Sequence, residues 1–331
     1  MAKRKVYPKP TELAKKLLKL TADQDYDVAR KAMHALAQGL EEPLRQGILE
    51  EGTLADIYAE IELEAGAESK FSLDFIAPGT EGDFVAFTIP DQARIPQRHV
   101  EGSEIWVPTF RVANSIDWSL SYARDARWDV VSRATEVLGE GITERLNDDG
   151  WHVILASAAS RGIVVQDDAA VTGEFTRRLA NRLKTVNKRV APGPGFTITD
   201  LYMSPEAFED IREWDNTEVD ELTRREIFTD ADGGLAGIYG IRLHELKKLG
   251  VGQAYQDFIT TNLGVAVPSG DEEFVVSLDL TRRDSFVEPI RSRVEVFEDQ
   301  WLHREQKAGL YAWTERGFAA LDNRRALLGS F

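Results

Sequence analysis

The chain has 331 residues, which corresponds to about two domains of ordinary size. Apolar residues make up 43% and charged residues 29%, a globular mixture that excludes a largely disordered or collagen-like chain. No run of about 18 apolar residues occurs, so no membrane span is expected, and the absence of cysteine excludes disulfides, thiolate catalysis and cysteine-ligated zinc. With 40 basic and 56 acidic residues the net charge is −16, so the surface as a whole repels nucleic acid.

Positive charge gathers in two short segments of this acidic chain. Residues 1–20 contain seven basic residues and one acid, and residues 177–189 contain six basic residues and no acid. Such local basic elements can meet a polyanion at limited places, and the alternative is a solvated face and a terminal tail. The candidate polyanion contacts are Lys3, Arg4, Lys5, Arg177, Arg178 and Arg182.

The first residues predict two helices. Residues 11–20 place leucines opposite lysines behind a capping Thr11, which is typical of a short amphipathic helix. A second helix is predicted over about 24–40, ending near Gly39 and Pro43.

Beyond these helices the pattern changes to that of strands. Residues 69–76, 83–89 and 104–122 are rich in β-branched and aromatic residues, and a turn cluster lies at 77–82. Together they predict a long β-ribbon. Because an isolated hairpin is marginal in water, the ribbon is expected to lie on another surface.

One long helix is predicted over about 124–158, with a length of about 50 Å. The apolar positions that mark its buried face are Trp128, Val131, Leu138, Ile142 and Leu146. Gly139, Gly141 and Gly150 each cost about 1 kcal/mol relative to Ala, so a bend or break is expected near 147–150.

The remaining chain predicts a compact mixture of helices and strands. Ser204 is a helix cap, followed by Pro205 at the first helical position, and the helix is expected to end near Trp214. The other predicted elements are a basic helix up to Val190, strands over 196–203 and 272–280, and further strands between about 286 and 321.

No motif indicates catalysis or metal binding. The five histidines are scattered singly, without an HExxH pair, and the two calcium-loop candidates, at Asp215 and Asp230, lack required positions. No GxSxG, Walker A or kinase signature occurs. The sequence therefore assigns no catalytic, cofactor-binding or metal-binding residue, and the chain is expected not to be an enzyme.

The order of the elements resembles that of the tailed-bacteriophage major capsid protein family, whose fold is shared with encapsulins. The similarity covers about residues 43 to 331. The passages that carry it are PLRQGILEEGTLADI (43–57), EIWVPTFRVANSIDWSLSYARDARWDVVSRATEVL (104–138), ITDLYMSPEAFEDIREW (198–214), EIFTDADGGLAGIYGIRL (226–243) and GLYAWTERGFAALDNRRALL (309–328).

This resemblance implies an α+β chain with the tailed-phage major capsid fold. Its expected parts are an N-arm (1–65), an extended β-hairpin E-loop (66–104), a P-domain (105–173) with the long helix as its spine, an A-domain (174–285) and a return to the P-domain (286–331). The final strands need partners, and the return strand of the ribbon, 104–120, is the obvious one.

The resemblance also implies a major head protein that assembles into an icosahedral shell around packaged double-stranded DNA. The E-loop is expected to lie across a neighbouring P-domain, because one hairpin cannot bury all of its apolar side chains. These are Phe71, Leu73, Phe75, Phe84, Phe87 and Ile89. The N-arm helices are expected to clasp another neighbour. In some members of this family, a lysine of the E-loop forms an isopeptide bond with a neighbouring subunit. The single lysine of this ribbon is Lys70, near its base, so no autocatalytic isopeptide bond is expected.

The implied partners are further copies of the chain, as hexamers and pentamers, with a portal and a separate scaffolding protein, because only about 65 residues precede the ribbon. Whether a decoration protein is present is left open. DNA is expected to be contacted weakly and non-specifically, and no membrane is expected to be involved. The expected location is the virion capsid, assembled in the host cytoplasm. Two alternatives remain: an encapsulin-type cargo compartment, and an acidic two-domain hydrolase that uses paired carboxylates.

Overall fold

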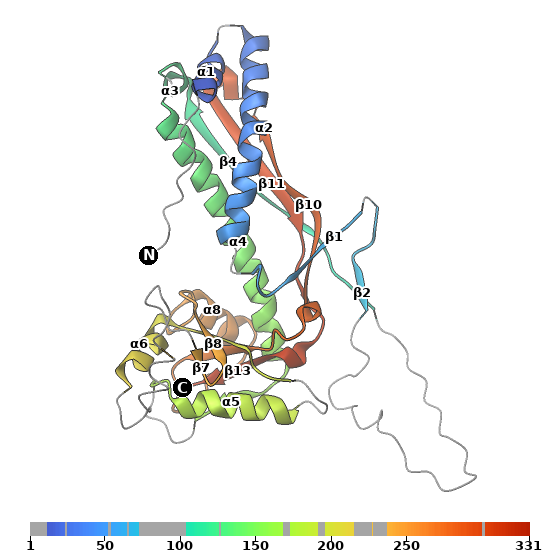
Figure 1. Ribbon diagram of the computed structural model, residues 1–331, viewed down its shortest axis with the longest axis vertical. Helices are drawn as coiled ribbons and strands as arrows, with labels where there is room; N and C mark the ends of the chain where they lie inside the picture. The colour runs from blue at the N-terminus through green and yellow to red at the C-terminus, as the bar shows by residue number, and fades with distance from the viewer. Residues whose placement is uncertain are drawn as a thin grey trace, which may run out of the picture. The chain divides into compact units, whose positions relative to one another are not determined.

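The computed structural model describes eleven parts of the chain: residues 12–23, 25–51, 54–64, 66–72, 104–125, 127–167, 173–190, 196–214, 227, 237–299 and 302–331. The chain divides into two compact units. Unit 1 contains Met1–Ser69, Val107–Gly150 and Glu288–Phe318, and unit 2 contains Lys70–Trp106, Trp151–Val287 and Ala319–Phe331. Figure 1 shows the helices and strands of both.

Two helices begin unit 1, α1 (Glu12–Leu20) and α2 (Tyr26–Glu51). The predicted end of the second helix near Gly39 and Pro43 is wrong, because α2 continues through both residues. A proline inside a helix costs about 3 kcal/mol. The burial of Leu40 and Leu44 on either side of Pro43 offsets that cost, since each buried leucine contributes about 1.5 to 3 kcal/mol.

The long strands of unit 1 form a sheet in the order β1 (Ala59–Glu62), β10 (Phe286–Glu298), β11 (Lys307–Arg316) and β4 (Phe110–Ser119), and β12 (Ala319–Ala320) pairs with the start of β10. Strands β4 and β11 are antiparallel and in register along their whole length. This confirms the expected pairing of the return strand with the final strands. β10 and β11 are also antiparallel, with two register shifts.

Strand β4 ends earlier than predicted. Ser119 accepts a hydrogen bond from the Ser121 backbone N–H at 3.3 Å, and this cap starts the short helix α3 (Leu120–Arg124). A 3-10 turn, η4 (Leu302–Glu305), leads into β11.

Helix α4 (Trp128–Ser160) is the long helix that the sequence predicts, and it is continuous. The expected break near 147–150 is therefore wrong. The glycines mark close approaches instead: a Cβ at Gly141 would lie 2.7 Å from Asn114 Nδ2, and one at Gly150 would collide with the side chain of Leu54. In Figure 1, α2 and the first turns of α4 run along the strands of the sheet.

Unit 2 contains a two-stranded ribbon, β2 (Lys70–Ser72) and β3 (Glu104–Trp106), which pair antiparallel. Strand formation at its base is thus confirmed. The rest of the predicted ribbon, including 83–89, lies outside the described residues.

The main sheet of unit 2 has six strands in the order β5-β13-β9-β6-β8-β7. Their bounds are β5 Val164–Gln166, β13 Ala326–Ser330, β9 Phe274–Leu278, β6 Asp200–Met203, β8 Ile241–Glu245 and β7 Gly237–Ile238. Every residue of β6, β9 and β13 is buried. The strands predicted over 196–203 and 272–280 are confirmed as the shorter β6 and β9, whereas β13 was not predicted.

The helices of unit 2 pack around this sheet. They are α5 (Arg177–Val190), α6 (Pro205–Glu213), α8 (Ala254–Asp257), the π-helix η2 (Phe258–Asn262) and the 3-10 turns η3 (Arg283–Ser285) and η5 (Asn323–Arg325). The predicted cap is confirmed: Ser204 Oγ accepts a hydrogen bond from the Ala207 N–H at 3.2 Å. Leu179 and Leu183 of α5 are buried in the core of unit 2, with Val186 packed against it.

Candidate functional site

One face of the unit 1 sheet is exposed at most of its residues, and we call it the open face. Alternate residues of three neighbouring strands form it, since successive strand residues point to opposite sides. They are Arg111, Ala113, Ser115 and Asp117 of β4, Tyr311, Trp313 and Glu315 of β11, and Glu295 and Phe297 of β10. The intervening residues, such as Val112, Leu310 and Val296, are buried.

Aromatic rings cross the open face from strand to strand. Phe297 and Tyr311 stack with ring centroids 5.4 Å apart, and Phe297 and Trp313 with centroids 6.3 Å apart. Arg111 places its guanidinium carbon 4.9 Å from the centroid of the Trp313 ring. Phe297 is 37% exposed and Tyr311 36% exposed. Aromatic side chains with a nearby arginine are typical of the centres of protein interfaces.

Charged pairs flank the aromatic rings on the open face. Glu315 accepts hydrogen bonds from Arg111 Nε and Thr109 Oγ1, each at 3.0 Å, and the bond from Arg111 lowers the pKa of Glu315. Lys307 Nζ lies 2.7 Å from Asp117 Oδ2, and this hydrogen bond raises the pKa of Lys307. These pairs hold both charge signs at fixed places on the face.

The proposed E-loop contacts are described only at the base of the ribbon. Phe71 is half-buried on β2, and Trp106 on β3 is 63% exposed. The other E-loop residues that the sequence singles out lie outside the described residues: Leu73, Phe75, Phe84, Phe87 and Ile89.

The marked positions of the long helix lie mainly in the core of unit 1. Val131, Leu138, Ile142 and Leu146 are all buried, whereas Trp128 is partly exposed. Asn114 of β4 donates from Nδ2 to the Leu138 carbonyl at 3.2 Å, which ties the helix to the sheet. These residues therefore stabilise the unit itself, and an assembly role for them stays a prediction.

The basic residues of α5 differ in exposure. Arg177 and Arg178 are exposed, and Arg178 Nε lies 3.4 Å from the buried carboxylate of Asp167. Arg182 is half-buried. Lys3, Arg4 and Lys5 lie outside the described residues. Contact with a polyanion thus stays a prediction for both segments.

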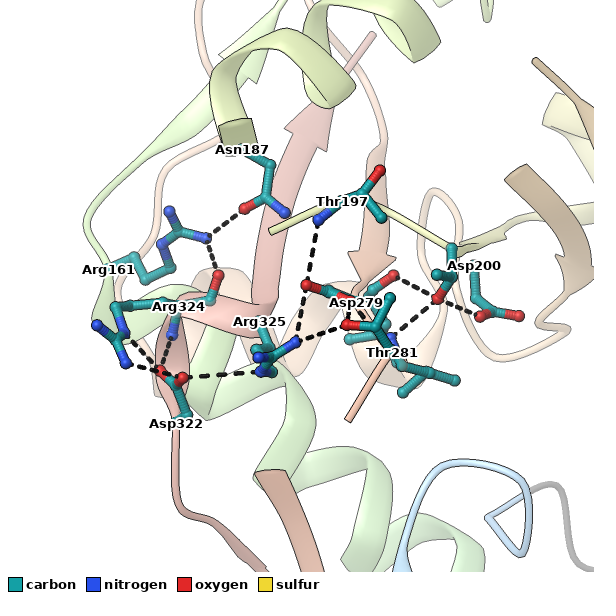
Figure 2. A network of polar contacts seen from close by, with 12 residues as sticks. Arg161, Asn187, Thr197, Asp200, Asp279, Thr281, Asp322, Arg324 and Arg325 are labelled. Atoms are coloured by element: carbon teal, nitrogen blue, oxygen red, sulfur yellow. Dashed lines mark hydrogen bonds and ion pairs between the residues drawn. The ribbon is translucent and has the colours of Figure 1, made fainter. Parts of the chain in front are cut away.

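A buried arginine network in unit 2 was not predicted from the sequence (Figure 2). Arg325 Nη1 lies 2.8 Å from Asp279 Oδ2 and 2.9 Å from Thr281 Oγ1. The Asp279 side chain is fully buried and that of Arg325 is 6% exposed. Asp279 also accepts hydrogen bonds from the backbone N–H groups of Thr197 and Thr281.

Two more arginines extend this network. Arg324 binds Asp322 through Nε at 2.8 Å and Nη2 at 3.0 Å, while Phe196 lies beneath both Arg324 and Arg325. Arg161, just after α4, donates from Nη1 to the carbonyls of Arg324 and Ala326, and burial lowers its pKa. The network fixes the approach to β13, and the only sequence signal for it is the pair Arg324-Arg325 before an apolar run.

In unit 2, a cluster of polar side chains surrounds Asp200. His244 Nε2 lies 2.7 Å from Asp200 Oδ1, and Asp200 also binds Arg242 and Thr199. Burial opposes ionisation of Asp200, but these hydrogen bonds, led by His244, lower its pKa. Within the described ranges, no group of three or more His, Asp or Glu side chains is placed to hold a metal ion.

Among the helices in the described parts of the chain, none is both long and apolar enough to cross a bilayer.

Known capsid structures share this fold. The chain is similar to the capsid structure of cyanophage P-SCSP1u, with a TM-score of 0.58 and 12% sequence identity over 84% of this chain and 88% of that chain. It is also similar to the mature capsid of bacteriophage PhiM1 (TM-score 0.52, 10% identity, 85% and 87% covered). A third match is the capsid of an empty GTA particle (TM-score 0.52, 14% identity, 85% and 89% covered).

The sequence by itself matches no family model and no curated protein. The likeness is therefore one of fold. It confirms the expected α+β class and the tailed-phage major capsid fold.

Proposed function

We propose that this chain is a major capsid protein, which assembles as hexamers and pentamers into an icosahedral shell around double-stranded DNA. The observation that carries the proposal is the breadth of the structural likeness: about 85% of this chain aligns with nearly 90% of solved capsid chains. Because the match includes both units, it supports the architecture of a capsid subunit for this chain. A subunit of a shell must make contacts that close around rotation axes.

The open face supports this proposal because it offers a surface for a neighbouring copy. The E-loop, with Phe71 at its base, carries more apolar side chains than one hairpin can bury. The stacked rings of Phe297 and Tyr311 are half-exposed apolar surface of the kind that such a ribbon covers. In the proposed shell, the E-loop of one copy lies across the open face of the next.

The first helices provide a second contact. The inner side of α2 is buried, including Met33, Leu36 and Leu40, so this helix serves its own unit. In contrast, Leu13 is 69% exposed and Tyr26 is 47% exposed. Such exposed residues of the proposed N-arm are available to clasp a neighbour. Many such contacts per subunit sum to a shell that does not dissociate.

The net charge of −16 suits a container for DNA, because overall repulsion lets the genome slide in and out. The basic segment 1–20 and the exposed Arg177 and Arg178 are the proposed local attractors for DNA or for a scaffolding protein. A chain lacking residues 1–20 should show weaker, less salt-dependent retention of DNA fragments. If its salt dependence equals that of the full chain, the segment is only a solvated end.

Sedimentation velocity and electron microscopy of the purified chain test the proposal. Closed shells of uniform size support it, and a small oligomer of the 37.1 kDa chain under all assembly conditions contradicts it. The nucleic acid content of shells purified from cells then separates a viral head from an encapsulin-type compartment. Nuclease-protected double-stranded DNA indicates the head, and an enclosed protein cargo indicates the compartment.

A further inference from the structure

Strand β4 is a long, regular edge of the unit 1 sheet. Its ten residues pair with β11 without a register shift, and among the described residues no strand pairs with its other side. Proteins usually protect such edges with short strands, lysine, proline, bulges or charges. β4 contains neither lysine nor proline, and Val112–Ile116 carries no charge.

The other sheet edges are protected in these ways. β1 has four residues and carries Glu60 and Glu62, which pair with Arg293 at 3.5 and 2.5 Å. In unit 2, β7 has two residues, β5 has three, and the two strands of the ribbon, β2 and β3, have three each. Within the described residues, β4 is thus the edge that is open to another strand.

The direction of the backbone groups of β4 can be assigned. The carbonyl oxygen of Ile116 points toward β11, since it lies 2.8 Å from where a Cβ of Gly309 would be. Backbone groups alternate along a strand, so Arg111, Ala113, Ser115 and Asp117 point their N–H and C=O groups away from β11. Among these outward backbone groups, the Ser115 N–H has a partner within the chain, since it donates to Asn114 Oδ1 at 2.9 Å.

We propose that β4 pairs antiparallel with β4 of a second copy, around a two-fold axis through Asn114. In this register the outward residues pair with each other: Ala113 lies opposite Ser115 of the second copy, and Arg111 lies opposite Asp117. Each pair occurs twice, as two-fold symmetry requires of a self-complementary patch.

The charges of the open face support this register. The Arg111 side chain is 69% exposed and that of Asp117 is 44% exposed, so both can reach a partner. Their own partners, Glu315 and Lys307, lie on the inner side, on β11. Pairing therefore creates a row of alternating sign: Glu315 and Arg111 of one copy, then Asp117 and Lys307 of the other. Opposite charges across strands stabilise a sheet.

The side chains on the other face of β4 also fit this register. Val112 falls opposite Ile116 of the second copy, and both are β-branched. Ile116 is only half-buried in the single chain, so pairing adds apolar contact there. The location of this β4 pairing at the two-fold axes of a shell rests on the proposed function. The pairing of two β4 strands does not.

Cysteine cross-linking maps this register, since the natural chain has no cysteine. In the variant Asn114→Cys, the two introduced residues face each other with Cα atoms about 4.5 Å apart, close enough for a disulfide. In Ser115→Cys the same residues are offset, with Cα atoms roughly 8 Å apart, which is too far. The double variant Ala113→Cys/Ser115→Cys brings cysteines together again and leaves Asn114 intact.

Under mild oxidation we expect a disulfide dimer, on a non-reducing gel, from Asn114→Cys and from the double variant, with at least tenfold less from Ser115→Cys. Equal dimer from all three, or none from the first and third, overturns the pairing. Electron microscopy of the same samples separates the two proposals. Shells without these cross-links contradict only the β4 pairing, and cross-linked dimers that never form shells contradict only the shell.

Discussion

The two main sheets of this chain differ in how completely the chain covers them. In unit 2, β6, β9 and β13 are buried along their whole length, and both edge strands have three residues or fewer. In unit 1, the sheet keeps an open face with half-exposed Phe297 and Tyr311, and it ends on the ten-residue strand β4. Among the described residues, one sheet is covered within its unit, and the other keeps an exposed face and an unpaired edge.

The polar groups follow the same division. Asp279 and Arg325 of unit 2 form an ion pair that is almost fully buried, whereas Arg111 and Asp117 of unit 1 lie at the surface. Buried charges have to be paired, and they fix one local arrangement. Exposed charges can instead exchange partners when another surface arrives.

The largest expected effect is in the buried network of unit 2. Asp279→Ala leaves Arg325 as a buried, uncompensated charge and removes acceptors for Thr197 and Thr281. We expect a loss of about 3–5 kcal/mol in the free energy of unfolding, measured by urea denaturation. The matched control in unit 1, Asp117→Ala, should cost about 1 kcal/mol or less, because its pair with Lys307 is exposed. If both variants lose the same free energy of unfolding, the contrast between buried charges in unit 2 and exposed charges in unit 1 is wrong.

Two glycines in the helices of unit 1 come next. Gly150→Ala places a methyl group against the buried Leu54, and overpacking of this kind costs about 1–3 kcal/mol. Gly39→Ala is the control, since a Cβ there meets nothing within 4 Å, and it should raise the free energy of unfolding by up to about 1 kcal/mol. Thermal or urea denaturation measures both, and a stabilising Gly150→Ala would contradict the packing of α4.

A substitution on the open face is expected to have a small effect on folding and a large effect on assembly. Tyr311→Ser removes a half-exposed ring, so the free energy of unfolding should change by about 1 kcal/mol or less. An aromatic residue at the centre of an interface contributes about 2 kcal/mol or more per contact, so shells should be lost. Tyr311→Phe keeps the ring and should assemble normally. Light scattering during assembly measures this, and shells from Tyr311→Ser at normal yield would show that the face is not an interface.

The smallest expected effect is one of pH. Burial raises the pKa of Glu273, which accepts a hydrogen bond from Ser204 Oγ at 2.5 Å. A raised pKa means that the folded chain holds this proton more tightly than the unfolded chain. Its contribution to stability is therefore complete below the ordinary value of 4.5 and is lost as the pH rises through the folded pKa. Glu273→Gln should flatten this part of the pH profile of the melting temperature.

Glu315 of unit 1 is the control with the opposite sign. The hydrogen bond from Arg111 lowers its pKa, so its contribution is present above 4.5 and is lost as the pH falls through the folded pKa. Glu315→Gln should therefore reduce stability near neutral pH and leave it unchanged in acid. If both variants shift the melting temperature in the same direction at neutral pH, the assigned causes of the pKa shifts are wrong.

The sequence predicted the elements whose pattern is local. The apolar spacing from Trp128 to Leu146 predicted α4, and Ser204-Pro205 predicted the start of α6. It was wrong where tertiary packing decides. Pro43 does not end α2. The glycines of α4 do not break that helix, because the side chains of Leu44, Asn114 and Leu54 lie close to Gly139, Gly141 and Gly150.

The candidate site was harder to predict for the same reason. Tyr311 and Trp313 lie in a predicted strand, but their stacking with Phe297 depends on the register between β10 and β11. That register is set by pairings far apart in the sequence. The buried arginine network likewise joins residues 161, 279 and 325, and a pair of arginines before an apolar run is as typical of a solvated turn.

A cryo-electron microscopy map of the purified, assembled chain tests the central claim, that the sheet of unit 1 is completed by other copies. We expect closed shells in which density from a neighbouring copy covers Phe297 and Tyr311. Single chains, or shells in which these two rings face solvent, would contradict it.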